Sequence, residues 1–223
     1  MASLKERIND LTGFDSTDDN ALASYLGDGV REVINLLPRD LKYKCSQVTN
    51  LYVGNTNTTE SLDGKGEILQ VTRRNGSGGY FIPARQVDPR YGDLTNNTSS
   101  LMHKASSTDP IYWIESNSSD AATLFVKPTV DADSPAKIIH VSYPTFVISG
   151  GQEYDITAQS SILNFPDEVE HIVVLYAAVK VAERQLAVEE DVELYGPLIN
   201  TLKQSYIQGL QSIGVGVSQQ QGA

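Results

Sequence analysis

The fold of this chain is decided by residues 164–180, which read NFPDEVEHIVVLYAAVK. Pro166 followed by Asp167 and Glu168 is typical of a helix start, because proline is tolerated there and carboxylates are stabilised near the positive end of the helix dipole. Apolar residues then lie on almost every side of the predicted helix until Lys180. We therefore expect this helix to be buried on most sides against other helices.

Helical spacing also occurs near the start of the chain. Gly13 ends a short predicted helix whose apolar stripe is made of Leu4, Ile8 and Leu11. A longer amphipathic helix follows; it begins with a capping-box-like pair, Ser16 and Asp19, and stops at Pro38. Both helices must bury one face, so they are candidate neighbours of the apolar helix at 164–180.

A last helix is predicted after the acidic turn 189–191. Gly196 and Pro197 are expected to start or kink it. Its apolar stripe, spaced mostly by four residues, is made of Leu194, Leu198, Leu202, Tyr206 and Leu210. The two C-terminal helices therefore predict a buried helical hairpin.

From about residue 46 to residue 161 the apolar spacing shortens, and Ser, Thr, Asn and Gly accumulate between short apolar runs. This pattern is typical of antiparallel strands joined by turns. In the last predicted strand His140 alternates with apolar residues, so we expect it on the wet face. The polar segment 87–109 predicts a long loop whose order depends on a partner. The predicted strands are residues 48–53, 67–72, 80–82, 111–115, 123–127 and 137–143.

These patterns predict an α+β fold, in which both chain ends form a helical bundle and an antiparallel β-rich domain is inserted between them. We expect the bundle to comprise residues 1–45 and 162–213, and the inserted domain to comprise residues 46–161. Residues 214–223 carry no charge and too little apolar surface to fold alone. They predict an extended C-terminal arm, either frayed or ordered on a neighbouring subunit, for example as an added strand.

The chain is acidic, with 28 acidic and 17 basic side chains and a formal net charge of -11. Such a surface repels phosphate groups and disfavours tight nucleic-acid binding, although solubility explains the charge equally well. The single cysteine, Cys45, excludes an intrachain disulfide and fits a reducing compartment. No apolar run approaches membrane-spanning length, so we expect no membrane partner.

Residue types that carry catalysis or hold metals are sparse and scattered. His103, His140 and His171 show no metal-ligand spacing with one another or with Cys45. The glycines beside Lys65 precede a predicted strand, whereas a phosphate-binding loop precedes a helix. We therefore expect no catalytic residue, no metal and no cofactor, and we predict that the protein is not an enzyme.

Aromatic side chains are biased toward tyrosine, with eleven tyrosines and five phenylalanines. Tyrosine combines a large contact area with a polar tip and is favoured at interfaces, although amphipathic strand faces explain the same bias. Tyr80, Tyr112 and Trp113 are candidate partner-binding aromatics. A glycan-binding module that stacks sugars on these rings is one alternative function.

Residues 164–180 are preceded by PIYW at 110–113, KP at 127–128 and VSYP at 141–144. This pattern resembles neck proteins of tailed bacteriophages, the head-to-tail adaptor or connector family. The resemblance implies a structural virion protein at the head–tail junction, in a ring, typically a dodecamer, below the portal. It implies the portal and other neck or tail proteins as partners, with genome DNA passing through the ring without specific binding. Another neck or tail component, such as a tail terminator or a fibre-attachment protein, is the alternative.

Two groups of residues become site candidates under this resemblance. By its position, the polar arm is expected to contact the portal or a neighbouring subunit. Residues 167–213 carry eight acidic and three basic side chains, so we expect their acidic turn to face the channel, where like charge keeps DNA from adhering. The interface candidates are Ile213, Val215, Val217, Gln219, Gln220 and Gln221. The channel-facing candidates are Glu189, Glu190, Asp191 and Glu193.

Overall fold

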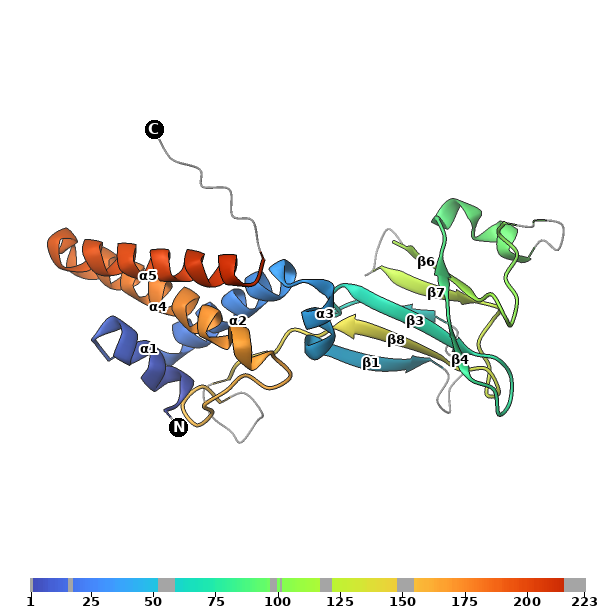
Figure 1. The fold of residues 1–223 in the computed structure, drawn as a ribbon, viewed down its shortest axis with the longest axis horizontal. Coiled ribbons are helices and arrows are strands. Elements are labelled where there is room, and N and C mark those ends of the chain that lie inside the picture. Colours follow the sequence, from blue (N-terminus) through green and yellow to red (C-terminus); the bar gives the residue numbers. More distant parts are fainter. Residues whose placement is uncertain are drawn as a thin grey trace. The chain divides into compact units, whose positions relative to one another are not determined.

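The computed structural model describes residues 2–15, 18–51, 59–96, 100, 102–116, 122–147 and 155–214. The chain divides into two compact units (Figure 1). Residues 1–45 and 143–223 make up the first, here called the helical unit, and residues 46–142 make up the second, the β unit. The described residues combine helices with mainly antiparallel sheets, which confirms the predicted α+β class.

The helical unit is built around one central helix. Its helices, among the described residues, are α1 (Leu4–Thr12), α2 (Asp19–Leu36), α3 (Arg39–Lys42), the 3-10 turn η1 (Tyr43–Cys45), α4 (Asp167–Glu189) and α5 (Val192–Ser212). α4 packs against α1, α2 and α5. Ten residues of α4 are buried, as its nearly continuous apolar surface predicts.

Local hydrogen bonds explain where the first helices begin and end. Ser3 and Glu6 form a capping box at the start of α1, and Gly13 ends α1 with a φ of 78°. α2 is capped by Asp18, whose carboxylate accepts a hydrogen bond from the Ala21 N–H at 3.0 Å. The predicted cap, Ser16, lies outside the described residues, and Asp18 performs this role with the same chemistry.

Part of the segment before α4 also belongs to the helical core. Ile156 is fully buried, and its carbonyl accepts a hydrogen bond from the Lys5 N–H at 3.2 Å. The carbonyl of Gln159 likewise accepts from the Leu4 N–H at 2.9 Å. The sequence grouped residues 143–161 with the β-rich domain, whereas the compact units divide after residue 142. The segment has no helical periodicity, so its membership of the helical core is a tertiary effect.

The described residues of the β unit form two four-stranded sheets. One has the strand order β1-β8-β3-β4 and the other has the order β2-β7-β6-β5. All pairs are antiparallel except the short parallel pair β5–β6. The strands are β1 (Ser46–Leu51), β2 (Thr59–Ser61), β3 (Ile68–Arg74), β4 (Phe81–Pro83), β5 (Arg85–Gln86), β6 (Ile111–Glu115), β7 (Thr123–Lys127) and β8 (Ala136–Val141).

The two sheets share one apolar core. Its buried members are Leu51, Val71, Leu124, Val126, Val130, Ala136 and Ile138. His140 points to the same side of β8 as Ile138, is 4% exposed, and lies 3.0 Å through Nε2 from Thr49 Oγ1. The expectation that His140 is solvated is therefore wrong. The period of two holds in β8 from Ala136 to His140, but the buried face there carries Ile138 and His140, while Ile139 is only half-buried.

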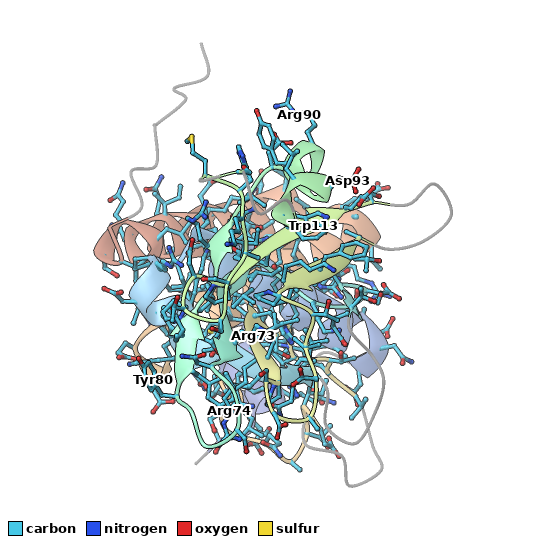
Figure 2. All side chains as sticks on the ribbon, turned by 90° about the vertical axis from the view of Figure 1, so that its right-hand side faces the viewer. Arg73, Arg74, Tyr80, Arg90, Asp93 and Trp113 are labelled. Carbon is cyan, nitrogen blue, oxygen red and sulfur yellow. The ribbon has the colours of Figure 1, made fainter. Side chains whose placement is uncertain are left out.

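The segment that follows β5 folds onto the second sheet. It contains the 3-10 turns η2 (Pro89–Tyr91) and η3 (Asp93–Asn96). A Cβ at Gly92 would lie 3.1 Å from the Trp113 ring, which itself stacks on Phe125 with centroids 5.2 Å apart. Figure 2 shows Trp113 beside the turns that carry Arg90 and Asp93. The described part of this segment thus packs on the second sheet of the same chain, whereas its polar sequence predicted a loop that a partner orders.

Candidate functional site

The turn between α4 and α5 holds the predicted acidic cluster, and two of its carboxylates are used by the fold. Glu189 accepts a hydrogen bond from Tyr195 Oη at 2.6 Å and another from the Gln185 side chain. Asp191 caps α5 by accepting from the Leu194 N–H at 3.0 Å. Both side chains are exposed at the surface, but their hydrogen bonds hold the turn in shape.

Glu190 and Glu193 have different surroundings in the same turn. Glu190 adopts the left-handed conformation, with a φ of 57°, and its N–H bonds to the Leu186 carbonyl at 2.8 Å. Glu193 lies in the first turn of α5, where the helix dipole stabilises a carboxylate. Both residues are exposed. The turn therefore presents these two carboxylates to whatever faces it.

Exposed apolar side chains neighbour these carboxylates in the sequence. Val188, Val192 and Leu194 are 71%, 66% and 61% exposed. The predicted stripe placed Leu194 in the core, whereas the buried residues of α5 include Tyr195 and Ile199. The helix begins at Val192 under the Asp191 cap, directly after the acidic turn, so Gly196 and Pro197 lie inside it and do not start it. The sequence signal for this start is Asp191, because an aspartate at the N-cap accepts a hydrogen bond from the N–H three residues later, here that of Leu194.

Negative charge is concentrated in the helical unit. This unit carries eighteen acidic and nine basic side chains, and the β unit carries ten acidic and eight basic ones. At least seven of the nine basic side chains form ion pairs inside the helical unit, for example Arg184 with Asp18 at 2.7 Å and Lys203 with Glu183 at 2.8 Å. Internal ion pairs therefore engage most of the positive charge and leave an acidic surface.

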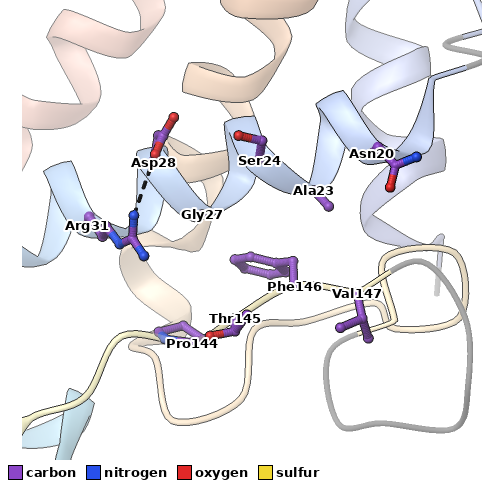
Figure 3. Close-up of a pocket in the computed structure, with 10 residues that line it drawn as sticks. All are labelled: Asn20, Ala23, Ser24, Gly27, Asp28, Arg31, Pro144, Thr145, Phe146 and Val147. Atoms are coloured by element: carbon purple, nitrogen blue, oxygen red, sulfur yellow. Dashed lines mark ion pairs between the residues drawn. The ribbon is translucent and has the colours of Figure 1, made fainter. Parts of the chain in front are cut away.

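A surface groove runs along α2 in the helical unit (Figure 3). Small residues of α2, including Ala23 and Gly27, form one wall, and Phe146 packs opposite them. At one end the Arg31 guanidinium lies 3.8 Å from the Asp28 carboxylate. The groove contains no nucleophile beside a base, so its shape supports contact rather than catalysis.

The three candidate aromatics are not brought together. Trp113 is 7% exposed and covered by Gly92, and its ring stacks on Phe125. Tyr112 faces the opposite side of β6 and packs against the shared core, with its Oη 3.3 Å from Gln86 Oε1. Tyr80 is 73% exposed just before β4. A sugar-stacking platform needs adjacent exposed rings, and these three residues do not form one.

The interface candidates fall almost entirely beyond the described chain. Ile213 follows the end of α5 and is half-buried. Val215, Val217, Gln219, Gln220 and Gln221 lie outside the described residues.

A model of the family described as SU10 adaptor protein matches residues 1–222. The chain belongs to the SU10 adaptor protein family. No curated protein matches the chain.

The SU10 adaptor family is a phage head–tail adaptor family, so the predicted resemblance is confirmed. The chain is therefore a phage structural protein, and virion association follows from the family. No helix in the described ranges is long and apolar enough to span a membrane. The candidate sites of this adaptor are therefore contact surfaces.

The cysteine and two of the histidines of this SU10 adaptor protein lie against other side chains of the chain. Cys45 is buried, and burial raises the pKa of its thiol to about 11, which suppresses the reactive thiolate. His103 stacks on Tyr91 with centroids 4.3 Å apart, and His171 lines a shallow groove with Leu11. Within the described ranges, no three His, Cys, Asp or Glu side chains are grouped as metal ligands.

Proposed function

We propose that this chain is a subunit of a dodecameric ring that lies below the portal in the neck of a tailed phage. The genome passes through this ring during packaging and ejection. The family supports a phage adaptor, and the ring, its position and the DNA passage are the further steps proposed here. The proposed partners are the portal and the neck or tail proteins on the other side of the ring.

The charge of the helical unit is the observation that carries this proposal. Its net charge is -9, whereas that of the β unit is -2, although the β unit contains 97 residues of the chain. A DNA passage benefits from a wall of like charge, because phosphate groups then do not adhere to it. We therefore assign the wall of the passage to the helical unit.

The segments of the chain take separate roles in this ring. Residues 1–45 and 162–213 form the bundle at its core, and the insertion within 46–161 faces neighbouring proteins. Within the acidic turn, Glu190 and Glu193 face the passage, while Glu189 and Asp191 maintain the turn through their hydrogen bonds. The arm at 214–223 contacts the portal or a neighbouring subunit.

The mass of the purified assembly tests the ring. We expect multi-angle light scattering and negative-stain class averages to show a closed ring, either for the protein alone or after mixing with its portal. Class averages also separate a ring below the portal from a tail terminator or a fibre-attachment protein by symmetry and diameter. A protein that stays monomeric with its portal present contradicts the proposal.

Charge reversal tests the position of the acidic turn. The double variant Glu190→Lys and Glu193→Lys is expected to make assembled rings retain double-stranded DNA at low salt. The matched control reverses Asp93 and Glu115, two exposed carboxylates of the β unit, to lysine. DNA retention by the first variant alone supports the assignment. Equal retention by both variants, or by neither, shows that the turn does not face the passage.

A further inference from the structure

Among its described residues the β unit has four edge strands, and three of them carry features that discourage pairing with another chain. β4 has three residues and ends in Pro83, which lacks an N–H. β2 also has three residues and carries Glu60, which pairs with Lys65 at 3.0 Å. β5 has two residues and begins with Arg85. Short edges, charges and proline are the usual protection of an exposed sheet edge.

β1 has none of these features. It has six residues, Ser46–Leu51, with no charge and no proline among them. In the described part of the chain it pairs with β8 alone, and Figure 1 shows it at the border of its sheet. All six residues are in register with β8, and Leu51 is anchored in the shared core. Val48 is 48% exposed. Within the described residues β1 therefore presents, over residues 47–51, a fixed edge without charge or proline, which is the geometry that accepts an added strand.

The chain also contains a segment suited to such an edge. Nine residues, 215–223, follow α5 and lie outside the described residues. Their sequence is uncharged, and Val215 and Val217 continue from Ile213 at every second position, with glycine between them. Alternation of this kind matches the two-residue period of a strand. Nine extended residues span about 30 Å, and a six-residue strand needs only about 20 Å.

Charge favours this pairing over other contacts between copies. Helical units with a net charge of -9 repel one another, whereas β1 and residues 215–223 are both free of charged side chains. Main-chain hydrogen bonds along β1 add affinity without requiring complementary charges. An uncharged edge and an uncharged tail can therefore meet between acidic subunits.

We propose that the outer edge of β1 accepts residues 215–223 of a second copy of this chain as an added strand. This inference rests on the proposed ring, which brings copies of the chain into contact. It gives the C-terminal arm a partner within the ring itself. Because each copy offers one edge and one arm, the exchange continues from subunit to subunit and closes around the ring.

Disulfide cross-linking between two different full-length variants tests the pairing. One chain carries Val48→Cys and the other carries Val217→Cys, and the two are mixed, with the portal if assembly requires it, and mildly oxidised. The native Cys45 is buried and does not compete. We expect a cross-linked pair of chains. The matched control, Val188→Cys with Val217→Cys, has a more exposed valine in the helical unit and is expected to give no cross-link.

A second measurement separates this inference from the ring. Val48→Lys with Asn50→Lys charges the β1 edge and is expected to abolish protection of the arm from proteolysis in the assembly. Rings that form while the 48–217 cross-link is absent overturn the inference and leave the proposed function standing. A cross-link confined to one chain that carries both cysteines also overturns it, because the arm then covers its own subunit. Absence of any assembly removes the proposed function as well.

Discussion

At the scale of single residues, Glu170 joins three parts of the helical unit. It lies in the first turn of α4 and is 6% exposed. One of its oxygens pairs with the Arg7 guanidinium of α1, and the other accepts the Ile162 N–H at 2.7 Å. Arg7 also donates to the Ser160 carbonyl at 3.1 Å. This carboxylate therefore ties α1 and the segment before α4 to the central helix.

Replacing Glu170 with alanine is expected to destabilise the helical unit by about 3 kcal/mol, because it leaves a partly buried guanidinium and a buried N–H without their acceptor. Urea unfolding followed by circular dichroism measures this loss. The matched control is Glu168→Ala, two residues earlier, whose pair with Lys44 is exposed on both sides and therefore contributes little to stability. Equal losses for the two variants contradict the role of Glu170.

Tyr206 connects α5 to α2 at a second polar contact. Its hydroxyl donates to Glu32 at 2.7 Å, and its ring lies 5.8 Å from that of Tyr176. Burial, and then the Glu32 carboxylate, raise the pKa of Tyr206 above its ordinary value of 10.0. The folded state therefore holds this proton more tightly than the unfolded state does.

The pH dependence of stability follows from this shift. Because the folded pKa is raised, the contribution of Tyr206 is complete below pH 10 and is lost as the pH rises above it. We expect the urea midpoint of the native protein to fall above pH 10. Tyr206→Phe should be less stable by about 1 kcal/mol at pH 7, through the lost hydrogen bond, and should show a weaker alkaline fall. Tyr80→Phe, at a 73% exposed position, controls for the loss of a hydroxyl. A fall of the same size in all three proteins contradicts the prediction.

At the scale of elements, α2 and α4 approach closely at one glycine. A Cβ at Gly29 would lie 2.8 Å from Cδ1 of Tyr176, a contact that real side chains do not make. The absence of a side chain there sets the separation of the two helices. Two residues earlier, a Cβ at Gly27 would meet only Phe146, at 3.9 Å, which is ordinary contact.

Alanine at these two glycines is expected to act with opposite signs. Gly29→Ala should destabilise the protein by about 1–3 kcal/mol, because the helices must separate or the Tyr176 ring must shift. Gly27→Ala should stabilise it by up to about 1 kcal/mol, because alanine is the better helix former and has room. Thermal unfolding of the two variants side by side measures the difference. A gain in stability at Gly29 would show that the α2–α4 contact is not tight.

The elements differ in how far the sequence predicts them. The strands at 111–115 and 123–127 have the predicted bounds, because each is a short apolar run bounded by proline or polar turn residues, which mark its ends. β2 and β5 were missed, because three and two residues are too few to show a period. In α5 the predicted stripe holds at Leu202 and Leu210, which are buried, but fails at the start of the helix, where Leu194 is exposed and Tyr195 is buried. Residues 194, 195, 198 and 199 are all apolar, so packing, not spacing, selects the buried set.

At the scale of the whole molecule, the order of helices, strands and helices was readable from the change of period along the chain. The acidic cluster was also evident from the sequence, but the different hydrogen bonds and conformations of its four acidic residues were not. That Glu189 binds Tyr195 while Glu190 closes the helix depends on the conformation of the turn. The burial of Trp113 depends likewise on Gly92, which lies 21 positions earlier in the sequence. Such contacts between distant segments leave no local pattern.

The β unit is expected to fold without the rest of the chain. Its first and last strands, β1 and β8, are paired, and Ser46 is in register with Val141, so the two ends of the insertion lie about 5 Å apart. Its buried core is made within residues 46–142. Excised residues 46–142 should therefore unfold cooperatively in urea, with Trp113 fluorescence as the probe, because this ring is buried inside the unit.

The complementary chain, in which a short glycine–serine linker joins Cys45 to Tyr143, should retain the helical circular-dichroism signal and its own transition. A β unit that unfolds without a cooperative transition, or a helical unit that loses its helices after the excision, would show that each depends on the other, and the insertion would then be part of one cooperative fold.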